Sequence, residues 1–168
     1  MGDCLPETFE KMSLGREALG NYIIPRFSTF VGKGKIILNI GKHSFVSYSK
    51  FFPDCEFLEL DKVANLNPDI TADIEEGIES VPNNHFDAVI MIGVYEYLFK
   101  PERAFREIGR ILKEGGYFLA ALPGVGYCDV GLDLHNWVDC FSLFRIEESY
   151  FFYENKKDVS SICVIVRK

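Results

Sequence analysis

The stretch Phe86-Asp-Ala-Val-Ile-Met-Ile92 gives the strongest strand signal in the sequence. It is an almost continuous apolar run, and such runs are typical of parallel strands that are covered on both faces of a sheet. The stretch Ile36-Ile-Leu-Asn-Ile40, followed directly by Gly41, has the same character. Together they predict two interior strands of a parallel sheet.

The segment 101–114 has the clearest helical pattern. Pro101 suits the first turn of a helix, where its missing N–H costs nothing. Apolar residues recur on one face and charged residues on the other. The pair Gly115-Gly116 is expected to supply the left-handed cap that stops the helix. The apolar face comprises Phe105, Ile108, Ile111 and Leu112, and the solvent face comprises Glu102, Arg106, Arg110 and Lys113.

Shorter runs predict the remaining elements. Helical spacing over 8–30 indicates one or two helices, with Pro25 interrupting the second half. A helix is expected over 44–52, stopped by Pro53, and a short helix or turn over 75–80. Further strands are expected at 55–60, 69–74, 117–122, 149–154 and 161–167.

The alternation of strands and helices predicts the fold class, which is α/β with a doubly wound, mostly parallel, Rossmann-like sheet. The last two strands are joined by the short polar turn 155–158, so they are expected to form an antiparallel pair. We expect one domain over 1–168. It would consist of an N-terminal helical segment (1–34), a core (35–123) and a short C-terminal part (124–168).

Composition excludes several classes of protein. A formal net charge of −7 argues against a nucleic-acid partner, because phosphate binding needs a basic surface. The apolar runs are too short to span a membrane, and the polar N-terminus does not resemble a signal peptide. The five cysteines are scattered without a C-x-x-C pair, which indicates reduced thiols and no metal site. These features predict a cytoplasmic protein.

Ligands of such sheets bind at the carboxyl ends of the strands. Gly41 provides the sharp turn after the first strand, but His43 takes the second position of the G-x-G-x-x-G pattern, which disfavours a nicotinamide or flavin oxidoreductase. Asp61 follows Gly41 by about twenty residues, a spacing that suits a carboxylate binding both hydroxyls of a ribose. Asp73 and Ile74, after the third strand, could meet an adenine.

Motifs in the right order give a specific resemblance. The sequence resembles class I S-adenosylmethionine-dependent methyltransferases, most closely the methyltransferase type 11 branch, over about 36–123. The stretches that carry the resemblance are Asp73-Ile-Glu-Glu, Val81-Pro, Phe86-Asp-Ala-Val-Ile, Val94-Tyr-Glu-Tyr-Leu98, Pro101, Phe105-Arg-Glu-Ile-Gly-Arg-Ile-Leu-Lys-Glu-Gly-Gly116 and Leu122-Pro123.

This resemblance implies S-adenosylmethionine as the cofactor and assigns residues to it. Gly41, with Asn39 before it, would lie against the amino-acid part, and Asp61 would hold the ribose. The adenine would lie between Asp73 and Ile74. Ile92 and Gly93, at the end of the fourth strand, would lie beside the sulfonium and its methyl group.

The sequence departs from the family pattern in its first loop and after the fourth strand. Asn39 stands where the family has an acid, and His43 and Phe45 stand where it has glycines. Tyr97 replaces the usual histidine. The part of the chain after Pro123 is also short, so it leaves little room for the usual substrate cap.

Three residues are candidates for the catalytic base that an oxygen or nitrogen acceptor needs. His135 lies in the segment after the fifth strand, where substrates would enter, and the alternative is a surface histidine. Tyr97 is the second candidate, and Tyr127 is a lesser one. The sequence therefore predicts methyl transfer to a small-molecule acceptor, such as a sugar or a biosynthetic intermediate. The alternative is an inactive, methyltransferase-like binding or regulatory module, and a homodimer could complete the short cap.

Overall fold

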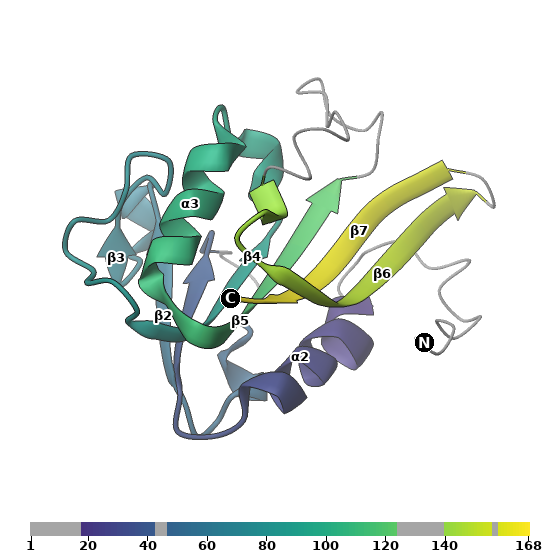
Figure 1. The fold of residues 1–168 in the computed structure, drawn as a ribbon, viewed down its shortest axis with the longest axis horizontal. Coiled ribbons are helices and arrows are strands. Elements are labelled where there is room, and N and C mark those ends of the chain that lie inside the picture. The colour runs from purple at the N-terminus through teal and green to yellow at the C-terminus, as the bar shows by residue number, and fades with distance from the viewer. Residues whose placement is uncertain (1–17, 43–46, 124–139, 156–157) are drawn as a thin grey trace.

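The computed structural model describes residues 18–42, 47–123, 140–155 and 158–168. For 153–155 and 158–160 it describes the backbone only. Helices pack on both faces of a central sheet, with α3 on one side and α2 on the other (Figure 1). No helix among the described residues is long and apolar enough to cross a membrane.

The described residues form a seven-stranded sheet of order β3-β2-β1-β4-β5-β7-β6. Strands β1 to β5 are parallel, while β7 runs antiparallel to both β5 and β6. The strand order reverses between β1 and β4, which opens a crevice at the carboxyl ends of the strands. The strands are β1 (Ile36–Ile40), β2 (Glu56–Asp61), β3 (Ile70–Thr71), β4 (Phe86–Ile92), β5 (Leu112–Pro123), β6 (Arg145–Asn155) and β7 (Asp158–Arg167).

The sheet confirms the predicted fold class. Strand β4 lies between β1 and β5, and its side chains are buried on both faces except for Asp87. The bounds predicted for the first and fourth strands agree with β1 and β4. The last two strands form the predicted antiparallel pair, and each extends beyond its predicted start.

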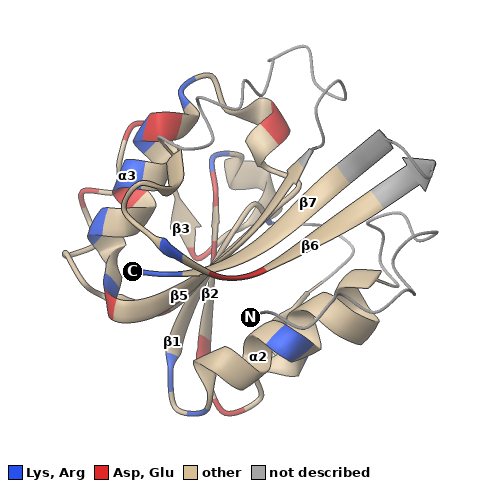
Figure 2. Cartoon of the chain, turned by 45° about the vertical axis from the view of Figure 1, so that its right-hand side comes forward, with Lys and Arg blue, Asp and Glu red and all other residues tan. Residues whose placement is uncertain are grey.

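Two apolar layers sandwich the sheet. Helix α3 (Pro101–Ile111) buries Phe105, Ile108 and Ile111 against one face, as its apolar periodicity predicts. Helix α2 (Ile24–Val31) packs on the other face through Ile24, Phe27 and Val31. Helix α3 carries charged residues along its length, whereas α2 carries a single one, Arg26 (Figure 2).

Pro25 lies inside a continuous helical run over 18–31. It is the second residue of α2 and lacks the N–H that would bond to the preceding turn, so it interrupts the regular hydrogen-bond pattern but not the helical path. The preceding turn, η2 (Leu19–Ile23), is π-helical, so the helical path continues from η2 into α2. The earlier part of the predicted segment, up to residue 17, lies outside the described residues.

The helix predicted over 44–52 is wrong for the part that the structure describes. Residues 49–51 form only a single 3₁₀ turn, η3 (Ser49–Phe51). Residues 43–46 lie outside the described residues. Aromatic contacts hold this segment in place. Phe52 stacks on Phe57 of β2 at 5.9 Å and contacts Phe27 of α2 at 6.3 Å, both measured between ring centroids.

The end of α3 and the length of β3 also differ from the predictions. Helix α3 ends at Ile111, three residues early, because the buried Leu112 pairs with Phe86 and begins β5. Gly115 has the expected positive φ of 76°, but it belongs to an irregular stretch of β5 and does not cap the helix. The third strand is only two residues long, so Asp73 and Ile74 follow it as a turn. Two 3₁₀ turns complete the fold, η4 (Ala64–Leu66) and η5 (Tyr95–Tyr97).

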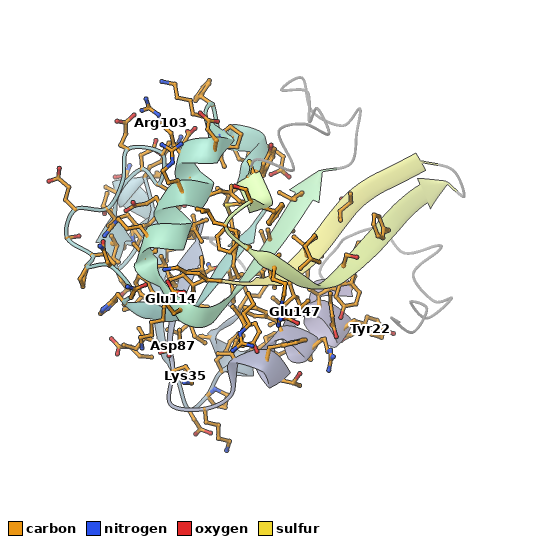
Figure 3. All side chains as sticks on the ribbon, in the orientation of Figure 1. Tyr22, Lys35, Asp87, Arg103, Glu114 and Glu147 are labelled. Carbon is orange, nitrogen blue, oxygen red and sulfur yellow. The ribbon has the colours of Figure 1, made fainter. Side chains whose placement is uncertain are left out.

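Asp87, the polar residue of β4, lies at the end of the sheet away from the strands' carboxyl ends. Its carboxylate accepts the N–H of Ile36 at 3.0 Å and pairs with Lys113 at 2.9 Å and Lys35 at 3.4 Å. Figure 3 shows Lys35 and Asp87 together there. Burial alone would raise the Asp87 pKa, but the two lysines and the Ile36 N–H outweigh it and lower the pKa. The charge therefore ties β1, β4 and β5 together.

Candidate functional site

A cavity of about 580 Å³ opens at the carboxyl ends of the parallel strands. This is the place that the reversal of strand order between β1 and β4 predicts for a ligand, and the volume is that of a site for a cofactor-sized molecule. Its walls come from four turns that follow β1, β2, β3 and β4, together with η5. They comprise residues 40–42, 60–63, 66, 72–74, 92–94 and 96–99.

The turn after β1 depends on Gly41. Its φ is 88°, and its N–H donates to the carbonyl of Leu60 at 2.8 Å. A Cβ at this position would come within 2.4 Å of Val94 Cγ2, so the Val94 side chain or the turn itself would have to shift. Glycine is required here both by backbone conformation and by close approach.

Asn39 fixes the same turn from within the sheet. It is the buried polar residue of β1, 3% exposed, and its Nδ2 donates to the carbonyl of Gly41 at 3.2 Å. An ionised acid, which the family has at this position, could not donate that bond. Asn39 does not line the cavity, so its observed contact is with the turn.

Asp61, at the end of β2, offers its carboxylate at the cavity wall. Oδ2 accepts the N–H of Lys42 at 2.9 Å, and Oδ1 accepts the N–H of Val63 at 2.8 Å. A carboxylate has about four acceptor positions, two on each oxygen. Each oxygen can therefore accept one more hydrogen bond, so the carboxylate could bind two neighbouring hydroxyl groups of a ligand.

Asp73 and Ile74 form the wall beyond β3. Asp73 Oδ1 accepts the N–H of Glu75 at 3.0 Å, and Oδ2 lies 3.6 Å from the ammonium of Lys62. Ile74 is buried, 4% exposed, and presents an apolar surface to the cavity. This combination of an acceptor with an apolar wall suits the edge and the face of a purine base.

The end of β4 supplies the opposite wall. Ile92 is buried, and Gly93 follows it with a φ of 66°, so the chain turns sharply at a residue that has no side chain. A ligand can therefore approach the backbone of Gly93 closely.

Exposed apolar side chains surround the mouth of the cavity. Val63 is 48% exposed, Tyr97 70% and Phe99 84%, and all three belong to the cavity wall. The carboxylate of Glu96 lies in the same wall. Exposed apolar patches of this kind mark surfaces that contact a ligand or a partner.

The structure brings together seven of the residues singled out in the sequence. Gly41, Asp61, Asp73, Ile74, Ile92, Gly93 and Tyr97 line one cavity, and Asn39 lies behind its first turn. His135 and Tyr127 lie outside the described residues. The described residues contain no group of acidic, histidine and cysteine side chains that could hold a metal.

Sequence reasoning missed several wall residues. Lys42 and Phe99 could not have been predicted to line the cavity. A lysine after a glycine, or a phenylalanine before a charged turn, is not a pattern that indicates a binding site. Only the folded chain shows that Lys42 crosses from the first turn to β2. Val63, two residues after Asp61, could have been found from its apolar character just after a strand.

Comparisons with known proteins identify the family. A family model described as a methyltransferase domain matches residues 32–120, more than half of the chain. No curated protein matches the chain in sequence.

Solved structures agree with the fold. The chain is similar to the N-methyltransferase NodS from Bradyrhizobium japonicum WM9, with a TM-score of 0.73, 16% identity and coverage of 90% of this chain and 96% of that one. It is similar to an S-adenosylmethionine-dependent methyltransferase from Archaeoglobus fulgidus, with a TM-score of 0.70, 14% identity and coverage of 96% and 97%. A third structure is the 1,6-didemethyltoxoflavin-N1-methyltransferase of Burkholderia thailandensis, with bound 1,6-didemethyltoxoflavin and S-adenosylhomocysteine, a TM-score of 0.66, 12% identity and coverage of 91% and 79%.

Because the family model covers more than half of the sequence, the chain belongs to the methyltransferase domain family, whose cofactor is S-adenosylmethionine.

Proposed function

We propose that this chain transfers a methyl group from S-adenosylmethionine to a small-molecule acceptor, such as a sugar or a biosynthetic intermediate. The observation that carries the proposal is the cavity of about 580 Å³, in which the Asp61 carboxylate keeps one acceptor position on each oxygen. The small-molecule class of acceptor is supported by the similar Burkholderia thailandensis structure, which holds 1,6-didemethyltoxoflavin.

The residues present fit the cofactor. Two acceptor positions on Asp61 suit the two ribose hydroxyls, and Asp73 with Ile74 suits the amino group and the face of adenine. We assign the amino-acid part to the turn at Gly41, which Asn39 holds in place. We assign the reacting end to Ile92 and Gly93, because Gly93 has no side chain to keep a ligand away from the backbone.

The cofactor supplies an already activated methyl group, so the protein mainly has to align the acceptor and exclude water. The apolar rim of Val63, Tyr97 and Phe99 would desolvate an acceptor at the mouth of the cavity. Tyr97 lines the cavity, and its phenolate form would take up the proton that such an acceptor loses, directly or through a water. His135, the first candidate from the sequence, lies outside the described residues and remains a candidate for this role.

A binding experiment tests the cofactor site. S-adenosylhomocysteine at about a hundred times its Kd should stabilise the protein by about 2.7 kcal/mol, which a thermal-unfolding series measures as a rise in Tm. Asp61→Ala should abolish the rise, because it removes both acceptor positions. Asp54→Ala removes an exposed carboxylate paired with Lys33 and should leave the rise intact.

No rise in Tm for the wild type at millimolar ligand would rule out the proposal. Turnover is a separate question. Binding of S-adenosylhomocysteine without methyl transfer to any acceptor of a small-molecule panel would favour the non-catalytic binding module.

A further inference from the structure

Lys42 joins the turn after β1 to β2 through both its backbone and its side chain. Its N–H donates to Asp61 Oδ2 at 2.9 Å. At the other end of the residue, Nζ lies 2.8 Å from Glu59 Oε2 and donates to the carbonyl of Asn67 at 2.8 Å. One residue therefore spans the end of β1, the end of β2 and the segment after η4.

The Lys42–Glu59 pair is well enclosed. The side chains are 25% and 16% exposed, whereas those of the Lys33–Asp54 pair are 86% and 53% exposed. Enclosed charges are less screened by water and salt than exposed ones, and removing one partner leaves the other uncompensated. The backbone of Glu59 is also held, because its N–H donates to Asp69 Oδ2 at 2.8 Å. The pair is thus a firm anchor for the turn.

This anchor determines where Asp61 points. The carboxylate is held by two N–H groups, one from Val63 on its own strand end and one from Lys42 on the neighbouring turn. Of these two contacts to the carboxylate, only the one from Lys42 comes from the end of another strand. If the Lys42 side chain were released, the backbone after Gly41 could move and the carboxylate could turn about its own side-chain bonds.

We propose that Lys42 is a positioning residue, which holds the Asp61 carboxylate in the orientation that accepts the ribose hydroxyls of the cofactor. This inference rests on the proposed function. It also gives the first turn a source of rigidity in a sequence where Gly41 is followed by Lys42-His43-Ser44-Phe45 and not by further glycines.

Two ligands separate this role from a merely structural one. The wild type and Lys42→Met are titrated by calorimetry with S-adenosylhomocysteine and with its analogue that lacks the ribose 2′-hydroxyl. Lys42→Met should weaken S-adenosylhomocysteine binding about tenfold, within the range of coupled neighbouring residues. Affinity for the analogue should change much less, because it lacks a hydroxyl that Asp61 would bind. The discrimination between the two ligands should therefore fall.

Matched variants control for the loss of one lysine and for the charge left behind. Lys33→Met breaks an exposed pair elsewhere and should change neither affinity. Lys42→Arg keeps a cation for Glu59 and should retain most of the discrimination. The double variant K42M/E59Q removes the unpaired carboxylate, so it keeps the test possible if Lys42→Met does not fold.

Equal weakening of both ligands by Lys42→Met, or no weakening of either, would overturn the positioning role. These outcomes differ from failure of the proposed function, in which the wild type itself would bind neither ligand.

Discussion

At the scale of single residues, the cavity depends on a few positions where only one kind of side chain fits. Asn39 must donate to the Gly41 carbonyl, and Asp61 must accept from two backbone N–H groups at once. Gly41 must leave room for Val94. Because these contacts join the ends of neighbouring strands, changing one of the residues should affect both the cavity and the stability of the fold.

Gly41→Ala tests the close approach. A Cβ at Gly41 would meet Val94 Cγ2 at 2.4 Å and would also occupy a positive φ. We expect the variant to lose about 2–4 kcal/mol in the free energy of unfolding, since steric overlap adds to backbone strain. Denaturant unfolding measures this loss.

Gly34→Ala is the matched control, because Gly34 also has a positive φ but has no heavy atom within 4 Å of a built Cβ. It should lose only about 1 kcal/mol, the cost of the backbone conformation. Equal losses in the two variants would show that contact with Val94 is not the cause.

At the scale of elements, α3 is tied to the turns before β4 by one carboxylate and one guanidinium. Glu107 accepts the N–H of Ile78 at 2.7 Å and forms a two-point pair with Arg110 at 2.6 and 2.8 Å. Arg110 in turn donates to the carbonyls of Ile78 and Val81 at 3.0 and 2.8 Å. Arg110 and Lys113, expected in solvent, are therefore half-buried partners of carboxylates.

This pair makes part of the stability depend on pH. The Arg110 guanidinium beside Glu107 holds the pKa of that carboxyl below its ordinary value of 4.5. Because the folded-state pKa is lowered, the stabilisation is present above the unfolded pKa and is lost as pH falls through the folded pKa. Near neutral pH, Glu107→Gln should lower the free energy of unfolding by about 1–3 kcal/mol.

The difference between wild type and Glu107→Gln should shrink as the pH is lowered below 4.5, the ordinary value of the Glu107 carboxyl. Urea unfolding at a series of pH values measures it. Glu114→Gln, whose carboxylate is 79% exposed, should show only a small difference at every pH. A difference for Glu107→Gln that stays constant down to acid pH would contradict the assignment.

At the scale of the whole molecule, an aromatic cluster joins α3, β5 and the segment before β6. Phe105 contacts Phe118 at 5.5 Å and Phe141 at 4.9 Å between ring centroids, both edge to face. Phe118 also lies 5.7 Å from Phe144. Phe141 and Phe144, from the described C-terminal part of the chain, thus belong to the hydrophobic core.

The variants Phe105→Ala and Phe99→Ala distinguish a residue that stabilises the core from a residue that contacts ligand at the mouth of the cavity. Phe105 is 1% exposed, so its loss should cost about 3–5 kcal/mol of stability. Phe99 is 84% exposed at the mouth, so its loss should leave the free energy of unfolding nearly unchanged while weakening ligand binding. Thermal unfolding with and without S-adenosylhomocysteine measures both effects. A large loss of stability in Phe99→Ala would place that ring in the core.

The sequence by itself determined the sheet and the place of the site. Strands β1 and β4 are apolar runs that only burial on both faces accommodates, so their bounds could be read directly. Parallel strands bring their carboxyl ends to one edge, which is why Gly41 and Asp61 could be predicted to meet there, and the family resemblance added Gly93.

The tertiary structure alone decided what depends on contacts between distant segments. Local pattern could not show that Leu112 would leave α3 to pair with Phe86, or that 49–51 would form only one turn against a neighbouring strand. Nor could it show that Lys42 would reach Glu59, since residues far apart in sequence become partners only after the strands align. Periodicity records burial within one element, whereas the geometry of the cavity is set by packing between elements.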